Sequence, residues 1–293
     1  MATPLIEDQK PDTNQLLLEA FENRWKDYRA ELKRCRAEFS NEAVHDLRVA
    51  TRRILALIQL LNSISPRPRL RKLIRMFKEQ LDEFDDLRDT QVMLAEISEI
   101  IHELPQLHDF QRHLQFTEER LLRMLRKKIK KLEISETTKR IRKTHETITT
   151  ETNSDLKSQV IQAIDDVYLI TRQRHGRVDL ARSATIHRVR IAFKSFRYMV
   201  EIVYPLLKNF PVENFKQMND YQSLMGEVQD VEIFTQTLAD FSEHVSFSDL
   251  EPVRQYCERR HAEAISAYAK ETNQLDTFWR FAPDQSFPWE KTE

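Results

Sequence analysis

The sequence predicts an all-α protein built from two related helical halves. Apolar residues recur at three- and four-residue intervals in the long segments, and no segment shows the alternation of a half-buried strand. Prolines fall between these segments, so they mark helix ends. A basic phrase that begins at His45 recurs from His187, an offset of 187 − 45 = 142 residues in a chain of 293. A repeat at about half the chain length indicates two copies of one helical unit.

The first half is predicted to contain five helices. Ser40 or Asn41 can cap the second of them and Asp89 the fourth, because each side chain can accept a hydrogen bond from an early amide. Pro66 and Pro68 separate the second helix from the third. We expect these helices over residues 14–38, 41–63, 68–87, 90–103 and 107–150, the last with a break near Ile134.

The second half is predicted to follow the same order, with Asp230 as the counterpart of Asp89 (230 − 89 = 141) and a loop at Gln173–Asp179. Its helices are expected over residues 154–174, 183–208, 212–227, 231–244 and 249–276. Short connections make sequential helices antiparallel neighbours, so we expect two pseudo-symmetric antiparallel four-helix-type bundles. The expected organisation is a tail at 1–12, one domain at 13–276 (repeats 13–150 and 151–276), and a tail at 277–293.

The repeated phrase places cations on one face of a helix in each half. At about 100° per residue, positions i, i+3 and i+7 share a face. The opposite face is apolar in both copies, so each helix has a packing side and a cationic side. The first stripe consists of His45, Arg48 and Arg52, and the second of His187, Arg190, Lys194 and Arg197.

The stretch from Arg48 to Lys78 contains nine Lys or Arg residues and no acidic residue. A solvated helix face normally mixes both signs, whereas so many like charges need a counter-charge from acidic helices or from an anionic ligand. Arginine forks, lysine ammonium groups and histidines spaced one turn apart suit a chain of phosphates. If the two stripes face one another, they form a central basic cavity that holds such a chain from both sides.

Composition excludes several classes of protein. Gly176 and Gly226 are the only glycines, so a P-loop or Rossmann fingerprint cannot be built. A net charge of −1 argues against binding of nucleic acid by bulk charge. Cys35 and Cys257 are too few for a disulfide framework, and no membrane-spanning stretch or secretory signal is apparent. We therefore expect a cytoplasmic protein with no membrane partner.

Enzymatic alternatives find little support in the residues. Glu-x-x-His pairs typical of di-metal bundles do not follow the repeat, since Ala184 stands where Glu42 would recur. Neither cysteine has a recognisable histidine partner, and Gly-x-Ser-x-Gly is absent. Aromatic residues accompany only the second stripe, so base stacking is disfavoured. We expect no catalytic residue, no metal ligand and no cofactor. The three Glu-x-x-His pairs are Glu42/His45, Glu99/His102 and Glu258/His261.

The duplicated phrase resembles the CHAD family, the conserved histidine α-helical domain. The copies read His45-x-x-Arg48-x-x-x-Arg52-Arg53 and His187-x-x-Arg190-x-x-x-Lys194-x-x-Arg197-Tyr198, and each is followed by an element that ends in Asp89 or Asp230. The likeness covers roughly residues 10–276. It implies two four-helix bundles around a basic cavity that binds inorganic polyphosphate. The Glu-x-Glu-x-Lys of the CYTH hydrolase domain, often fused to this family, is absent, so the resemblance is to a stand-alone member.

The resemblance assigns polyphosphate-binding roles residue by residue. Some positions depart from the family pattern: Leu55 and Ser195 replace basic residues, Asn219 is the counterpart of Lys78, and Asp85 stands where the second copy has Gly226. These departures imply weaker binding than in a member with every position filled. The candidate binding residues are His45, Arg48, Arg52, Arg53, Arg75, Lys78, His187, Arg190, Lys194, Arg197, Tyr198 and Lys216.

The sequence thus predicts a non-enzymatic, cytoplasmic protein that binds inorganic polyphosphate, with association with polyphosphate granules as a further expectation. A phosphohydrolase or metal-dependent enzyme that uses the same cavity is one alternative. A helical scaffold whose basic stripes meet an acidic protein partner is another. The sequence leaves the oligomeric state open. Stronger binding at mildly acidic pH is expected if His45 and His187 titrate at the site.

Overall fold

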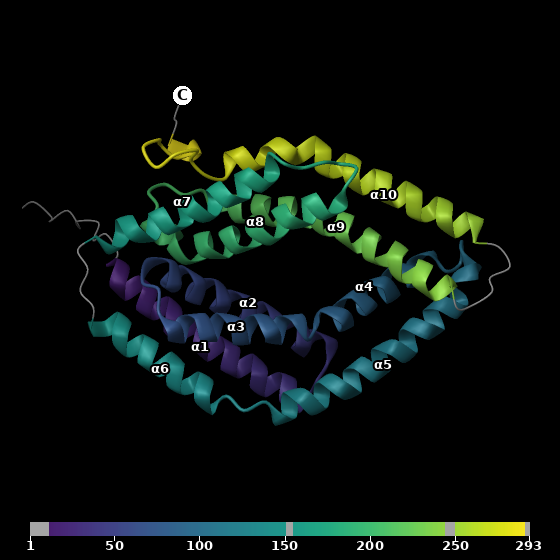
Figure 1. Cartoon of the computed structure of the whole chain (residues 1–293), viewed down its shortest axis with the longest axis horizontal. Helices are drawn as coiled ribbons and strands as arrows, with labels where there is room; N and C mark the ends of the chain where they lie inside the picture. The colour runs from purple at the N-terminus through teal and green to yellow at the C-terminus, as the bar shows by residue number, and fades with distance from the viewer. Residues whose placement is uncertain (1–11, 151–154, 244–249, 291–293) are drawn as a thin grey trace, which may run out of the picture.

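The computed structural model describes residues 12–150, 155–243 and 250–290, and these contain α-helices, short 3₁₀ turns and no strand (Figure 1). The fold is therefore all-α, as predicted. The α-helices are α1 (Thr13–Ala37), α2 (Asn41–Ile64), α3 (Pro68–Asp82), α4 (Asp85–Ile100), α5 (His108–Lys131), α6 (Ser135–Thr150), α7 (Leu156–His175), α8 (Ser183–Val203), α9 (Glu213–Ser242) and α10 (Glu251–Glu271).

Most helices pack against their neighbours in sequence, as short connections dictate: α1 on α2, α2 on α3, α4 on α5, and α7 to α10 in series. Contacts of α2 with α7 and α8, and of α4 with α9, join the two halves. In Figure 1, α1, α2, α3 and α6 lie below α7 and α8, while α4, α5, α9 and α10 extend to the right-hand end.

The main core is centred on α2 and α8. Both helices are apolar around much of their circumference, and Ile54, Leu57, Val189 and Phe196 are fully buried. A second apolar cluster joins α4, α5, α9 and α10 around Phe110. The two buried helices thus form a rigid centre, and any polar side chain on their contact face is held in place by packing.

Several predicted helix boundaries are confirmed and others are wrong. Ser40 caps α2, since its Oγ accepts the Ala43 amide at 3.2 Å, and the break near Ile134 separates α5 from α6. Asp89 and Asp230, however, lie inside helices rather than at caps. The chain turns earlier, between α3 and α4, and α9 is continuous, because packing overrides the local capping preference.

The segment that the sequence leaves as a tail from residue 277 is packed against the second half. Phe278 and Trp279 are fully buried. Trp279 Nε1 donates to Asp165 Oδ1 at 2.7 Å, and the Arg280 guanidinium donates to both oxygens of the same carboxylate at 3.0 and 2.6 Å. One buried carboxylate on α7 therefore anchors this segment, a contact between residues more than a hundred positions apart that no local pattern indicates.

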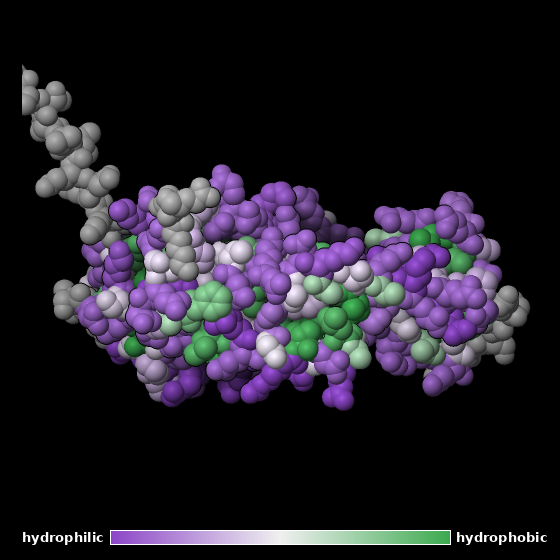
Figure 2. All heavy atoms as spheres, turned by 90° about the horizontal axis from the view of Figure 1, so that it is seen from above, coloured by the Kyte–Doolittle hydropathy of each residue, from purple (hydrophilic) through white to green (hydrophobic). Residues whose placement is uncertain are grey.

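The face seen in Figure 2 is largely hydrophilic, with separate hydrophobic areas between the hydrophilic ones. Within the described ranges, none of the helices combines the length and the apolar character needed to span a bilayer.

Candidate functional site

A cluster of four basic side chains lies where α2 packs against α8, and we call Arg48, Arg52, Arg190 and Lys194 the basic cluster. The two helices are also joined by a hydrogen bond from Ser195 Oγ to Gln59 Oε1 at 3.4 Å. Because each helix directs its apolar face into the core, the i, i+3, i+7 spacing leaves its cations together on the adjoining face. The structure thus brings Arg48 and Arg52 of the first predicted stripe together with Arg190 and Lys194 of the second.

Mutual repulsion within the basic cluster is visible in the pKa values. Burial, and next the charges of Arg52, Arg190 and Arg48, lower the pKa of Lys194 to about 6. Burial also lowers the pKa of Arg52 to about 10, with Arg48 and Arg190 acting in the same direction. Asp85 opposes both shifts without compensating for them. The cluster is therefore a site of unneutralised positive potential that an anion would relieve.

The equivalent arginines of the two halves, Arg48 and Arg190, have different surroundings. Arg48 is buried, and its Nη2 donates to Asp85 Oδ1 at 2.8 Å while Nη1 donates to the Leu81 carbonyl at 3.2 Å. At the repeat offset from Asp85 (226 − 85 = 141) stands Gly226, and the Arg190 guanidinium lies across it. A Cβ on Gly226 would lie 3.6 Å from Arg190 Nε.

The Arg190 Nε atom is buried and has no hydrogen-bond partner among the described residues. A buried donor without a partner is costly, and here the donor belongs to a cation. Arg48 is therefore hydrogen-bonded to a carboxylate, whereas Arg190, whose charge acts on the Asp230 carboxyl, keeps a buried donor that a ligand oxygen could satisfy.

Titratable groups of α4, α8 and α9 surround the basic cluster. Burial, and then the charges of Asp85 and Asp230, raise the pKa of Asp89 to about 6, and burial raises the pKa of Asp230. Burial, with the charge of Arg190, lowers the pKa of His187, so its imidazole is neutral at neutral pH. This lowering of the pKa opposes the expectation that His187 becomes charged at mildly acidic pH.

Arg53, Arg197 and Tyr198 adjoin this site but have partners of their own. Arg197 is buried, with Nη1 2.6 Å from Glu201 Oε1 and Nε donating to Gln222 Oε1 at 3.1 Å. Its guanidinium also lies 4.4 Å from the centre of the Tyr198 ring. Arg53 is exposed and reaches Glu201 at 4.0 Å. Glu201 thus holds two of the candidate residues, a role that its spacing of i+4 from Arg197 could have indicated.

Arg24 of α1 is a further cation that the sequence reasoning missed. Burial lowers its pKa, Glu201 opposes this shift, and Arg53 adds to it. Arg24 Nε is buried without a hydrogen-bond partner within the described ranges. No motif marks this residue, because its place beside α8 depends on packing of α1 against the second half.

Four candidates lie at the surface: His45, Arg75, Lys78 and Lys216 are exposed. Arg75 pairs with Glu79 at 3.7 Å and Lys216 with Asp220 at 2.6 Å, each along its own helix. None of the four is among the main charges that shift the pKa values of Lys194 and Arg52. The structure therefore does not bring them into the basic cluster.

The metal-centre alternative gains no geometric support. The three Glu-x-x-His pairs lie on different helices or helix ends. In the part of the chain that the structure describes, no three His, Cys, Asp or Glu side chains are grouped as metal ligands.

Comparisons with known proteins agree with this architecture. The family model described as CHAD domain matches residues 19–239. Among solved structures, the crystal structure of the CHAD domain from the plant Ricinus communis is similar, with a TM-score of 0.67 and 18% sequence identity. That alignment covers 94% of this chain and 93% of the plant chain. No curated protein sequence matches the chain. At this identity the structural likeness concerns the fold alone.

Proposed function

The chain belongs to the CHAD family, and from this premise we propose that it binds inorganic polyphosphate through the basic cluster of α2 and α8. In this proposal the phosphate chain lies in a basic cavity between two pseudo-symmetric halves and undergoes no chemical change there. The protein acts in the cytoplasm, where granules of polyphosphate are the natural place for it. Resemblance of the duplicated motif to the family supports the ligand, and the geometry supports the place.

The observation that carries the proposal is the uncompensated charge of the basic cluster. Three arginines and a lysine lie together, and the pKa values of Arg52 and Lys194 remain lowered although Asp85 opposes the shift. Arginine presents a planar fork that matches phosphate oxygens, and charge-assisted hydrogen bonds are about twice as strong as neutral ones. A slender chain with one negative charge per phosphate would restore the charge of Lys194 and satisfy Arg190 Nε.

Arg53, Arg197 and Tyr198 take a supporting role in this proposal. Their contacts with one another and with Glu201 fix the edge of the site next to the basic cluster. His187 contributes as a neutral hydrogen-bonding group. The exposed residues His45, Arg75, Lys78 and Lys216 would attract the ligand over a longer range and contribute less to affinity, because water and salt screen exposed charges.

A variant with all four residues of the basic cluster changed to Ala tests the assignment. We expect it to lose binding of long-chain polyphosphate in calorimetric titration while keeping its helical circular dichroism. The matched control removes the same number of positive charges from the exposed surface of α5 and should bind normally. Equal loss in both variants would reduce the interaction to unspecific charge, and retained affinity in the first would reject this site. The control residues are Arg120, Arg123, Lys127 and Lys130.

Two further outcomes would replace the proposal. Release of orthophosphate from polyphosphate with added Mg²⁺ or Mn²⁺, lost in the four-residue variant, would indicate a phosphohydrolase. Absence of polyphosphate binding, together with co-purification of a stoichiometric acidic protein, would indicate an interaction scaffold.

A further inference from the structure

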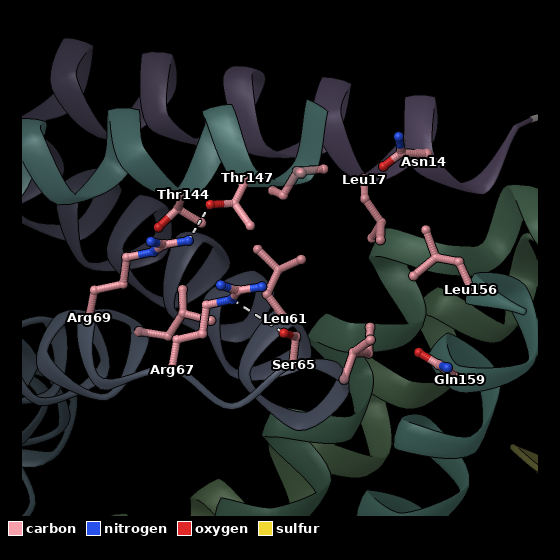
Figure 3. A pocket seen from close by; sticks show the side chains of 13 residues that line it. Asn14, Leu17, Leu61, Ser65, Arg67, Arg69, Thr144, Thr147, Leu156 and Gln159 are labelled. Carbon is pink, nitrogen blue, oxygen red and sulfur yellow. Dashed lines mark hydrogen bonds between the residues drawn. The ribbon is translucent and has the colours of Figure 1, made fainter. Parts of the chain in front are cut away.

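A second site lies where the ends of five helices meet, and none of the basic-cluster residues lines it. This pocket is formed by the start of α1, the end of α2, the start of α3, the end of α6 and the start of α7. Its volume is about 200 Å³. Figure 3 shows the Arg67 and Arg69 guanidinium groups on one side and Leu17 and Leu156 on the other.

The wall of the pocket combines aliphatic side chains with positive charge. Arg67 and Arg69 belong to the acid-free basic stretch of the sequence, and no Asp or Glu lines the described wall. The remaining polar lining groups are neutral hydroxyls and amides. The aliphatic residues are Leu17, Leu61, Ile64, Leu70, Ile148 and Leu156. A pocket with this lining favours an anion that carries an apolar body.

Arg69 is held so that it can receive such an anion. Its Nη2 donates to Thr147 Oγ1 of α6, a contact that fixes the guanidinium across the gap between α3 and α6 (Figure 3). Its Nε is buried and has no hydrogen-bond partner within the described part of the chain. Arg67 is oriented separately, with Nε donating to Ser65 Oγ at 3.3 Å. Preorganised guanidinium groups lower the cost of ordering side chains on binding.

We propose that this pocket binds a short aliphatic carboxylate of about six carbons. An apolar cavity of about 150 Å³ accommodates benzene, so a volume slightly above this suits a ligand of similar size. The carboxylate meets the guanidinium side, where Arg69 donates to it, and the alkyl chain lies along the leucine and isoleucine side chains. A phosphate chain fits less well, because it would leave charged oxygens against the aliphatic wall.

Calorimetric titration of the full chain with hexanoate tests this proposal, with 1-hexanol and inorganic phosphate as comparison ligands. We expect hexanoate to bind and each comparison ligand to bind at least tenfold more weakly. The variant Arg69→Leu should weaken hexanoate binding at least tenfold, since it removes a donor of charge-assisted hydrogen bonds. Ile148→Phe keeps the charges and should abolish binding by occupying the space. Arg71→Leu is the matched control, because Arg71 is exposed on the same helix and does not line the pocket.

The outcomes separate clearly. Binding that is lost in Arg69→Leu and Ile148→Phe, and kept in Arg71→Leu, supports the site. Absence of hexanoate binding, equal affinity for 1-hexanol, stronger binding of phosphate, or no effect of Arg69→Leu overturns it. Thermal unfolding of each variant verifies that it folds, and unchanged polyphosphate binding by Arg69→Leu shows that the two sites are independent.

Discussion

Lys194 provides the sharpest prediction, because its charge is suppressed in the free protein. Burial and the neighbouring arginines lower its pKa to about 6, so at pH 8 only about 1% of the side chain is protonated. Bound phosphate would stabilise the ammonium form and raise this pKa again. Binding at pH 8 should therefore take up about one proton at Lys194.

The sign and size of the pH effect follow from this shift. Affinity should rise as pH falls, because the proton required for binding becomes easier to supply. Between pH 8 and pH 6 the protonated fraction of free Lys194 increases from about 1% to about one half, so the association constant should rise by up to about 50-fold. Below pH 6 the part of the increase in affinity that comes from Lys194 should level off. Asp89, whose pKa is also about 6, adds proton uptake of the same sign.

The assay is calorimetric titration with long-chain polyphosphate between pH 6 and pH 8.5, in buffers of different ionisation enthalpy, which count the protons taken up. Lys194→Arg should stay charged between pH 6 and pH 8.5, so it should remove the contribution of Lys194 to the pH dependence and keep binding at pH 8. Asp89→Asn should remove the proton uptake that Asp89 contributes. Equal pH slopes and equal proton uptake in the native protein and Lys194→Arg would refute the reasoning.

Three further predictions follow from the structure. Gly226→Asp should give Arg190 the internal counter-ion that Asp85 gives Arg48 and should weaken polyphosphate binding about tenfold or more, as measured by titration. Gly226→Ala should bind polyphosphate normally, and equal affinities of the two variants would contradict the idea. Asp165→Ala should lower the free energy of unfolding in urea by about 3 kcal/mol, because it leaves the Arg280 cation unpaired. The control Asp166→Ala, at an exposed position, should lower it by less than about 0.5 kcal/mol, and equal losses would show that the anchor is unimportant. Polyphosphate affinity should fall steeply between about 50 and 200 mM salt, and a flat dependence would exclude phosphate neutralisation.

The sequence was sufficient for the fold class, whereas it left open whether the two stripes meet in space. Helical periodicity, the prolines and Ser40 are local signals, and the apolar faces of α2 and α8 predict that both helices pack into one core. That the cationic sides meet depends on tertiary packing, which places Arg52 near Arg190 and Lys194. The residue types and spacing place Arg48, Arg52, Arg190 and Lys194 among twelve candidates, and only the structure separates these four from the rest.

Other features depend on tertiary contacts that periodicity does not encode. Asp230 has the residue type of a helix cap, yet α9 continues through it because both ends of that helix are buried against neighbours. Whether Asp85 pairs with Arg48 depends on rotamers and on the distance between α2 and α4. Trp279 meets Asp165 across more than a hundred residues, so the local sequence of the C-terminal segment does not indicate which part of the fold anchors it.

The central claim is that the basic cluster is shaped for a slender phosphate chain, and one titration tests it most directly. The native protein should be titrated at near-physiological salt with long-chain polyphosphate, with double-stranded DNA and with orthophosphate. The account predicts tight binding of polyphosphate alone, because a duplex is too wide for a site between two packed helices and a single phosphate meets too few of its cations. Equal binding of DNA, or no binding of polyphosphate, would contradict it.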